Sequence, residues 1–147
     1  MTDERFYLLD NNALSHLTVA QRASEFFQEC CRLPSEVIYE AKGYPDAASF
    51  EDVEYPTTPN VLKHLGRVMT TVPANDTKLV NLYTNKGAAD PLLIACALDA
   101  MEHAAELLWG PTWIIVSNDK AVQGKAAELG VQALTREEFL ADTERQW

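Results

Sequence analysis

The strongest constraint on the fold is the alternation of two kinds of pattern along the chain. Short apolar runs that suit buried strands occur at residues 5–9 (RFYLL), 112–117 (TWIIVS) and 131–134 (VQAL). Longer segments with apolar residues at helical spacing lie between these runs, and no hairpin signal joins two strands. This alternation predicts an α/β fold with a mostly parallel central sheet. At 147 residues the chain fits a single domain, residues 1–147.

Several predicted helices carry recognisable end signals. N-cap residues are expected at Ser35, Thr58, Asp76 and Thr135. Pro59 would then occupy the first helical position, and Glu138 would complete a capping box. Helices are expected at residues 18–33, 36–43, 60–72, 77–86, 90–109, 119–130 and 135–143, with glycines ending several of them. Residues 44–57 contain two prolines and four acids without a clear period, so we expect a loop or flap there.

The charge balance limits the classes of function. The chain has 12 basic and 22 acidic residues, a net charge of −10, which argues against a general nucleic-acid coat with a broad basic face. A nucleic-acid enzyme stays compatible with this charge, because divalent metal ions in an acidic site offset the repulsion of phosphate. A partner protein that carries positive charge is compatible as well.

The remaining composition points to a cytoplasmic protein without a nucleotide cofactor. No apolar run approaches the ~20 residues that span a bilayer, and the opening residues do not predict a signal peptide. The three cysteines show no C-x-x-C spacing, which favours a reducing compartment; they are Cys30, Cys31 and Cys96. Neither G-x-x-x-x-G-K-[ST] nor G-x-G-x-x-G occurs. The scattered histidines are expected to be surface or partly buried side chains rather than ligands; they are His16, His64 and His103.

Four acids stand at the predicted ends of strands and helices. Asp10 follows the first strand directly, and Asp119 follows the strand at residues 112–117. Glu40 and Asp90 lie near predicted helix starts. Sites in parallel sheets form beyond the carboxyl ends of the strands, near the point where the strand order reverses. Because hard divalent cations prefer oxygen ligands, these four carboxylates predict a site for one or two such metals.

Each of these acids also has a purely structural interpretation. Asp10, Asp90 and Asp119 each precede a helix and can act as N-caps, with Pro91 suited to the position after Asp90. Glu40 shares a helix face with Glu36, and both suit a simple surface position. The sequence leaves these alternatives open.

In its acidic segments the chain resembles PIN-domain ribonucleases, in particular the VapC-type toxins of bacterial toxin–antitoxin pairs. The matching segments are YLLDNNALSHL, LPSEVIYEAKG, NKGAADPLLIACAL, WIIVSNDKAV and VQALTREEFL. They occur in the family's order and cover most of the chain, apart from residues 44–75. Two departures are visible: Asn11 stands where the family usually has Thr, and Pro91 follows the third acid where a small residue is usual.

The resemblance implies a PIN-like three-layer sandwich and an Mg²⁺- or Mn²⁺-dependent endoribonuclease. Carried over by motif, the catalytic acids are Asp10, Glu40, Asp90 and Asp119, of which Asp10, Asp90 and Asp119 would bind metal. Glu40 is preferred to Glu36 because it has the Glu-x-x-Gly spacing to Gly43. Asn12 and Ser117 would support the site, Ser117 by orienting the first acid. The resemblance also implies an RNA substrate, products with 3′-hydroxyl and 5′-phosphate ends, a small antitoxin partner and a homodimer.

Three lysines lie within four residues of a predicted acid: Lys42, Lys86 and Lys120. In so acidic a protein they would supply local phosphate contacts for RNA, although lysines near helix ends also serve simply to solvate a surface. Two other functions remain open. One is a PIN-like binding module that has lost catalysis, and the other is a PIN nuclease outside any toxin–antitoxin pair.

Overall fold

A five-stranded, all-parallel sheet forms the centre of the molecule, which we describe from a computed structural model covering residues 4–71 and 89–147. The strands are β1 (Arg5–Leu9), β2 (Cys31–Pro34), β3 (Glu54–Tyr55), β4 (Thr112–Val116) and β5 (Gln132–Leu134). Their order in the sheet is β3-β2-β1-β4-β5, and each neighbouring pair is parallel. The prediction of an α/β fold with a parallel sheet is therefore confirmed.

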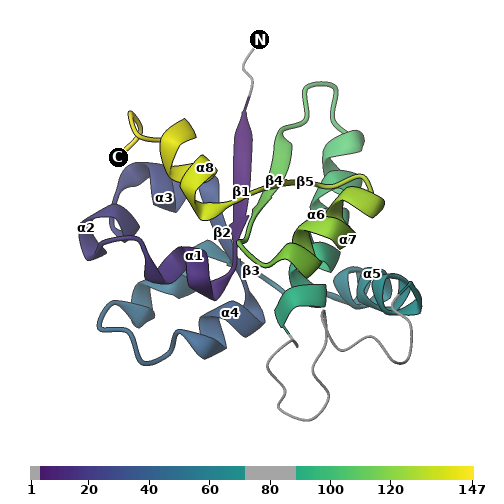
Figure 1. Cartoon of the computed structure of the whole chain (residues 1–147), viewed down its shortest axis with the longest axis horizontal. Helices are drawn as coiled ribbons and strands as arrows, with labels where there is room; N and C mark the ends of the chain where they lie inside the picture. Colours follow the sequence, from purple (N-terminus) through teal and green to yellow (C-terminus); the bar gives the residue numbers. More distant parts are fainter. Residues whose placement is uncertain (1–3, 72–88) are drawn as a thin grey trace.

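Helices cover both faces of the sheet (Figure 1). They are α1 (Asn11–Ser15), α2 (Val19–Arg22), α3 (Glu25–Cys30), α4 (Ser35–Glu40), the 3₁₀ helix η1 (Ala47–Val53), α5 (Pro59–Thr70), α6 (Ala89–Ala105), α7 (Lys120–Glu128) and α8 (Arg136–Asp142). Successive side chains of a strand point to opposite faces, so Leu9 packs in one core with α1, α3, α4 and α8. Leu8 packs in a second core with α5, α6 and α7. In the described parts of the chain, no helix is both long and apolar enough to cross a membrane.

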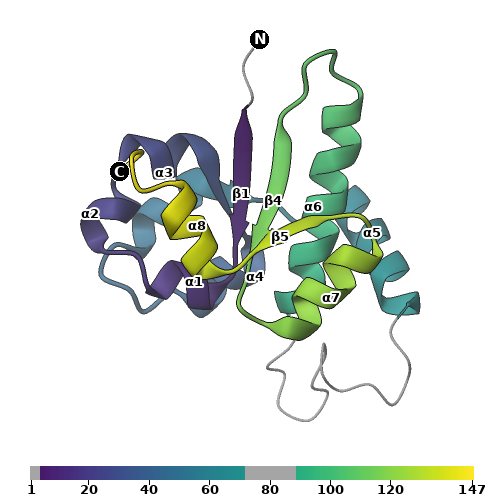
Figure 2. The same cartoon turned by 45° about the horizontal axis from the view of Figure 1, so that its top comes forward.

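The strand order reverses between β1 and β4. From β1 the chain moves outward to β2 and then to β3, and it later returns to the other side of β1 as β4, continuing outward to β5. The helices that leave the two central strands therefore diverge, an arrangement typical of binding sites beyond the carboxyl ends of the strands. In Figures 1 and 2 the carboxyl ends of β1 and β4 lie near α1, α4 and the beginnings of α6 and α7.

The predicted helix at residues 18–33 is two helices, α2 and α3, with a break at residues 23–24, and it is wrong for residues 31–33, which belong to β2. Thr18 caps α2 through a capping box, and Ser24 restarts the chain as the N-cap of α3 by accepting a hydrogen bond from the N–H of Phe27. The chain then enters β2, where Cys31 pairs with Tyr7 of β1 and is fully buried. A strand of four residues is too short to show its own period inside a helical pattern, and its pairing with β1 decides the structure.

Residues 35–57 differ from the prediction at several points. Ser35 is the first residue of α4 rather than its cap, since Pro34 holds the N-cap position without a side-chain hydrogen bond. The helix ends at the C-cap residue Ala41, before Gly43. The expected loop at residues 44–57 contains η1 and β3, because Phe50 and Val53 are fully buried and fix the chain against the sheet.

The other local signals agree with the structure. Thr58 caps α5, with Pro59 at the first position, and the capping box of Thr135 opens α8. Gly130, at φ +77°, follows the end of α7 in a backbone conformation that suits glycine. The predicted helix at residues 77–86, with its cap Asp76, lies outside the described residues.

Candidate functional site

Asp10 leaves the sheet at the point where the strand order reverses. Leu9 is the last residue of β1 and pairs with Val116 of β4. The N–H of Asp10 continues this pairing by donating to the carbonyl of Val116 across 3.2 Å. The half-buried carboxylate then accepts a hydrogen bond from the N–H of Ala13 at 2.7 Å through Oδ1, which makes Asp10 the N-cap of α1. Backbone pairing thus fixes the position of this acid.

Ser117 and Asp119 leave β4 beside Asp10. Ser117 is fully buried, and its N–H donates to the carbonyl of Leu134 at 3.0 Å. Its Oγ accepts a hydrogen bond from the N–H of Asp119 at 3.1 Å. Oδ1 of Asp119 in turn accepts from the N–H groups of Ala121 at 2.8 Å and Val122 at 3.4 Å. Asp119 is therefore the N-cap of α7.

The capping interpretation is correct for Asp10 and Asp119, and it does not exclude a site. Each carboxylate has two oxygens, and the capping hydrogen bonds use only Oδ1. Within the described residues, Oδ2 of Asp119 accepts no hydrogen bond. A cap also fixes the rotamer of the carboxylate, so its second oxygen is held in a defined direction. Such an acid is already oriented for a cation or a water molecule.

Electrostatic interactions connect three of the four predicted acids. Burial raises the pKa of Asp10, and the charge of Asp119 raises it further, whereas the N–H of Ala13, the hydroxyl of Ser117 and the charge of Arg136 oppose this rise. Partial burial also raises the pKa of Glu40, with further contributions from Glu36 and from Asp10. Glu40 lies at the last position of α4 with an exposed side chain. Asp10 is thus near enough to interact with both other acids.

Asp90 lies in the first turn of α6, whose first residue is Ala89. Asp90 therefore lies inside the helix, which differs from the alternative in which Asp90 is the N-cap and Pro91 the first helical residue. The beginning of α6 lies close to the carboxyl ends of β1 and β4 in both cartoon views (Figures 1 and 2). The side chain of Asp90 is outside the part of the chain that is described, and its role as a ligand stays a prediction.

Of the predicted acids whose side chains are described, Asp10 and Asp119 form a pair, and Glu40 is a third, exposed acid that interacts with Asp10. Among residues 4–71 and those side chains described from 91 onward, no three His, Cys, Asp or Glu side chains lie close enough together to hold a metal ion. Mg²⁺ usually binds one or two carboxylates and completes its shell with water and substrate phosphate. The oriented carboxylates of Asp10 and Asp119 match this requirement, so the residues present fit a hard divalent cation.

Arg136 is a cation at this edge that the sequence did not indicate. Its Nη1 lies 3.1 Å from Oδ1 of Asn12, and its charge lowers the pKa of Asp10. The supporting residue Asn12 is therefore held by α8 rather than by its own helix. Arg136 is 124 positions from Asn12 in the chain, and no spacing within a motif could have connected them.

The phosphate contacts expected of the three lysines stay a prediction, and the structure gives the surroundings of Lys42 and Lys120. Nζ of Lys42 lies 4.1 Å from the ring centroid of Tyr39, and Lys120 is exposed at the first position of α7. No ion pair joins Lys42 or Lys120 to an acid in the part of the chain that is described. Lys86 lies outside that part.

A second buried acid, Asp99 of α6, lies away from this edge. Asp99 is 2% exposed; the hydroxyl of Tyr55 donates to its Oδ2 at 2.6 Å, and the amide of Asn60 donates to Oδ1. His103 adds an ion pair at 3.5 Å. These contacts join β3, α5 and α6, which indicates a structural role.

A cavity of about 470 Å³ opens at the other end of β1. Its lining includes Glu4, Phe6 and Phe26, so it lies at the amino end of the strand that carries Asp10 at its carboxyl end. The candidate acidic site is therefore separate from this cavity.

No protein-family model matches the chain, and no curated protein matches it at a significant level.

Proposed function

We propose that the protein is a metal-dependent endoribonuclease with a PIN-like arrangement of its sheet and helices. The observation that carries the proposal is the pairing of Asp10 and Asp119 at the reversal of strand order, where each acid is oriented by a backbone cap and the two interact electrostatically. A carboxylate whose pKa is raised by burial and by a neighbouring acid, as that of Asp10 is, is typical of sites that bind a cation or transfer a proton. The sheet order and the helices on both faces support the same reading.

Each residue of the site has a proposed role in metal binding or catalysis. Asp10 and Asp119 would hold a divalent cation, with Asp90 as a further candidate ligand at the start of α6. Glu40, at the end of α4, would orient the attacking water. Ser117 keeps the two central carboxylates in place, because its buried hydroxyl contacts both Asp10 and the N–H of Asp119. When bound, Mg²⁺ or Mn²⁺ supplies activation of water and stabilisation of charge on the attacked phosphate.

A cleavage assay tests this proposal. Purified protein is incubated with total transfer RNA and ribosomal RNA in Mn²⁺, Mg²⁺ or EDTA, beside the Asp119→Asn variant, in which asparagine can still cap α7. We expect cleavage that needs the metal, is lost in the variant and leaves 3′-hydroxyl and 5′-phosphate ends. Cleavage that persists in EDTA or leaves cyclic phosphate ends contradicts the proposal.

A binding module without catalysis is the second candidate. The observation that favours it is that the described acids serve as helix caps and do not form a three-ligand cluster. A folded protein that binds RNA or a partner but neither binds Mn²⁺ nor cleaves RNA would support this function instead.

The resemblance to VapC-type toxins extends the proposal to a type II toxin–antitoxin pair. In that setting a small antitoxin would cover the acidic edge, and the nuclease would act as a homodimer in the cytoplasm. A neighbouring gene for a small protein that binds this chain and blocks cleavage supports the pairing. Its absence favours a PIN nuclease with another role.

A further inference from the structure

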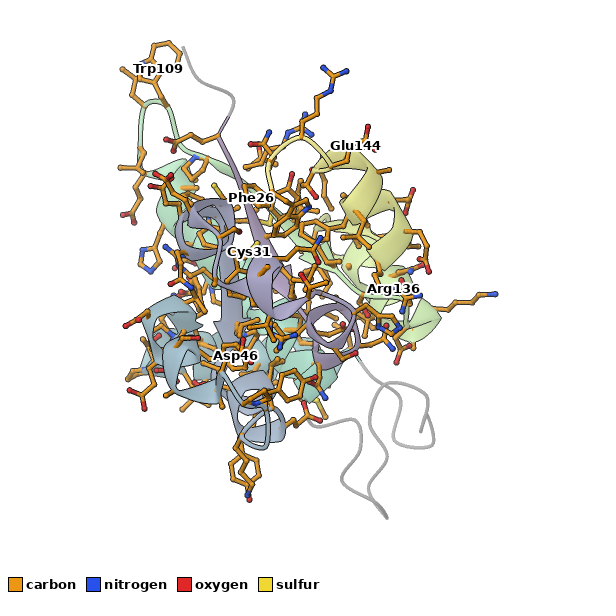
Figure 3. The ribbon with its side chains drawn as sticks, turned by 90° about the vertical axis from the view of Figure 1, so that its left-hand side faces the viewer. Phe26, Cys31, Asp46, Trp109, Arg136 and Glu144 are labelled. Carbon is orange, nitrogen blue, oxygen red and sulfur yellow. The ribbon has the colours of Figure 1, made fainter. Side chains whose placement is uncertain are left out.

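Arg136, the first residue of α8, lies between the two halves of the sheet at the acidic edge. Its Nη1 lies 3.1 Å from Oδ1 of Asn12 and 3.1 Å from each ring nitrogen of His16. Its Nη2 donates to Oε1 of Glu137 at 2.8 Å. Figure 3 shows Arg136 beside the helix that follows β1. The guanidinium therefore reaches from α8 to both ends of α1.

The first turn of α8 is also fastened to the chain that leaves β4. The N–H of Arg136 donates to Oδ1 of Asn118 at 2.6 Å. The amide of Asn118 donates to both carboxylate oxygens of Glu137, at 3.2 and 3.1 Å. Asn118 stands between Ser117 and Asp119. The backbone of Arg136 is thus positioned by the same loop that carries the candidate metal ligand Asp119.

The guanidinium retains capacity for a further ligand. Guanidinium has five N–H donors in a planar fork, and within the described residues its Nε donates to no partner. Its anionic partner, Glu137, is an exposed neighbour, with 61% of its side chain accessible against 22% for Arg136. An exposed pair of this kind contributes little to stability, so a phosphate can replace the carboxylate at low cost.

Binding of an RNA phosphate at this edge requires a positively charged group, because several acids lie there. Asp10, Asp119, Glu40 and Glu36 form an acidic surface that repels RNA until a metal is bound. Among the described residues, Arg136 is the cation whose charge acts on Asp10. Arginine also binds phosphate in a bidentate manner, which lysine cannot do.

We propose that Arg136 is a substrate-binding residue that contacts an RNA phosphate adjacent to the one cleaved, with Asn12 and His16 holding the guanidinium in place. This inference rests on the proposed nuclease function. Glu137 would act as the competing anion that occupies Arg136 when no RNA is bound. A purely structural role, in which Arg136 fastens α8 to α1, makes different predictions.

Steady-state cleavage kinetics in Mn²⁺ separate the two roles, with transfer RNA as the probe substrate. We expect Arg136→Ala to raise KM by about 10- to 100-fold, the usual value of a charged hydrogen bond, with little change in kcat. We expect Arg136→Lys to be intermediate. Loss of one phosphate contact should also make the negative slope of log affinity against log salt shallower by about 0.7.

Two further variants keep the test independent of folding. Glu137→Ala removes the competing carboxylate and should lower KM, an effect that a structural clamp does not produce. Arg145→Ala removes the same charge from an exposed position beyond the other end of α8, so its KM should equal that of the wild type.

The outcomes distinguish this inference from the proposed function. Wild-type protein that cleaves RNA, together with an Arg136→Ala variant whose KM and salt slope equal those of Arg145→Ala, overturns the role of Arg136 and leaves the nuclease intact. Wild-type protein that cleaves no RNA overturns both. A raised KM in Arg136→Ala with a lowered KM in Glu137→Ala supports the inference.

Discussion

The N–H of Asp10 donates to the carbonyl of Val116 across 3.2 Å, one residue beyond the last ladder pair of Leu9 with Val116. This hydrogen bond fixes the residue that follows β1 against the last residue of β4. Ser117 follows Val116 directly, so the acid and the buried hydroxyl emerge side by side. The position of the candidate site therefore follows from sheet register, which is among the most strongly determined features of a buried parallel sheet.

Substitution can separate the capping role of Asp10 from its proposed role in catalysis. Asparagine keeps the N-cap of α1 but removes the charge, whereas alanine removes both. We expect Asp10→Asn and Asp10→Ala each to lower cleavage by about 100-fold or more. Asp10→Ala should in addition be less stable than Asp10→Asn by about 1 kcal/mol, measured by urea denaturation. Equal stabilities would show that the hydrogen bond to Ala13 contributes nothing.

The raised pKa of Asp10 predicts how stability depends on pH. Because the folded state disfavours the charged carboxylate, Asp10 destabilises the fold as pH rises from the ordinary value of 3.8 through its raised value. Asp10→Asn should therefore be more stable than wild type at pH 7, without metal. The difference should shrink as pH falls toward about 4 and be followed by urea denaturation at several pH values. A difference that stays constant with pH contradicts the electrostatic account.

Ser117→Ala should affect both neighbouring acids. The variant loses the buried hydroxyl that accepts from the N–H of Asp119 in a partly buried hydrogen bond, at a cost of about 1–3 kcal/mol. It also loses the interaction that lowers the pKa of Asp10, so the acidic limb of the pH–rate profile should move to higher pH. Ser117→Cys, close in volume, serves as the packing control. An unshifted limb in Ser117→Ala would remove Ser117 from its orienting role.

Asp99 offers a buried acid as a control for the acidic edge. Asp99→Ala leaves the hydroxyl of Tyr55 without its acceptor and removes one of the two acceptors of the Asn60 amide, the other being Glu102, so we expect a loss of about 1–3 kcal/mol in stability. Tyr55→Phe should lose about 1 kcal/mol. Asp99→Asn should retain cleavage at temperatures where it is folded, since Asp99 lies away from the edge. Loss of cleavage by a folded Asp99→Asn protein would contradict a catalytic site confined to the edge that carries Asp10 and Asp119.

Local patterns in the sequence predict the parts of the fold that local physics determines. A few neighbouring residues are enough to predict the strands β1 and β4 and the caps at Thr58 and Thr135. The same holds for the positions of Asp10 and Asp119 after their strands. The helix prediction fails at β2, because Cys31 and Leu33 are strand residues only through pairing, Cys31 with β1 and Leu33 with β3, and through burial in the core. Phe50 likewise anchors η1 through contacts distant in sequence.

The candidate site shows the same division. The acids follow their strands and are visible as motifs, whereas the support of Asn12 by Arg136 depends on α8 folding back over α1. Lys42 and Lys120 are close to the acids in sequence but form no ion pair with an acid in the described residues, and their phosphate contacts stay a prediction. Side-chain contacts across the sheet edge require the tertiary structure.

Mn²⁺ binding measured by electron paramagnetic resonance tests the central claim most directly. Wild-type protein, Asp10→Asn, Asp119→Asn and Asp99→Asn are each titrated with Mn²⁺ at neutral pH. We predict that the wild type and Asp99→Asn bind Mn²⁺, and that each of the two edge variants weakens binding strongly. Binding by the wild type that neither edge variant alters, or no binding at millimolar Mn²⁺, contradicts a metal site at Asp10 and Asp119.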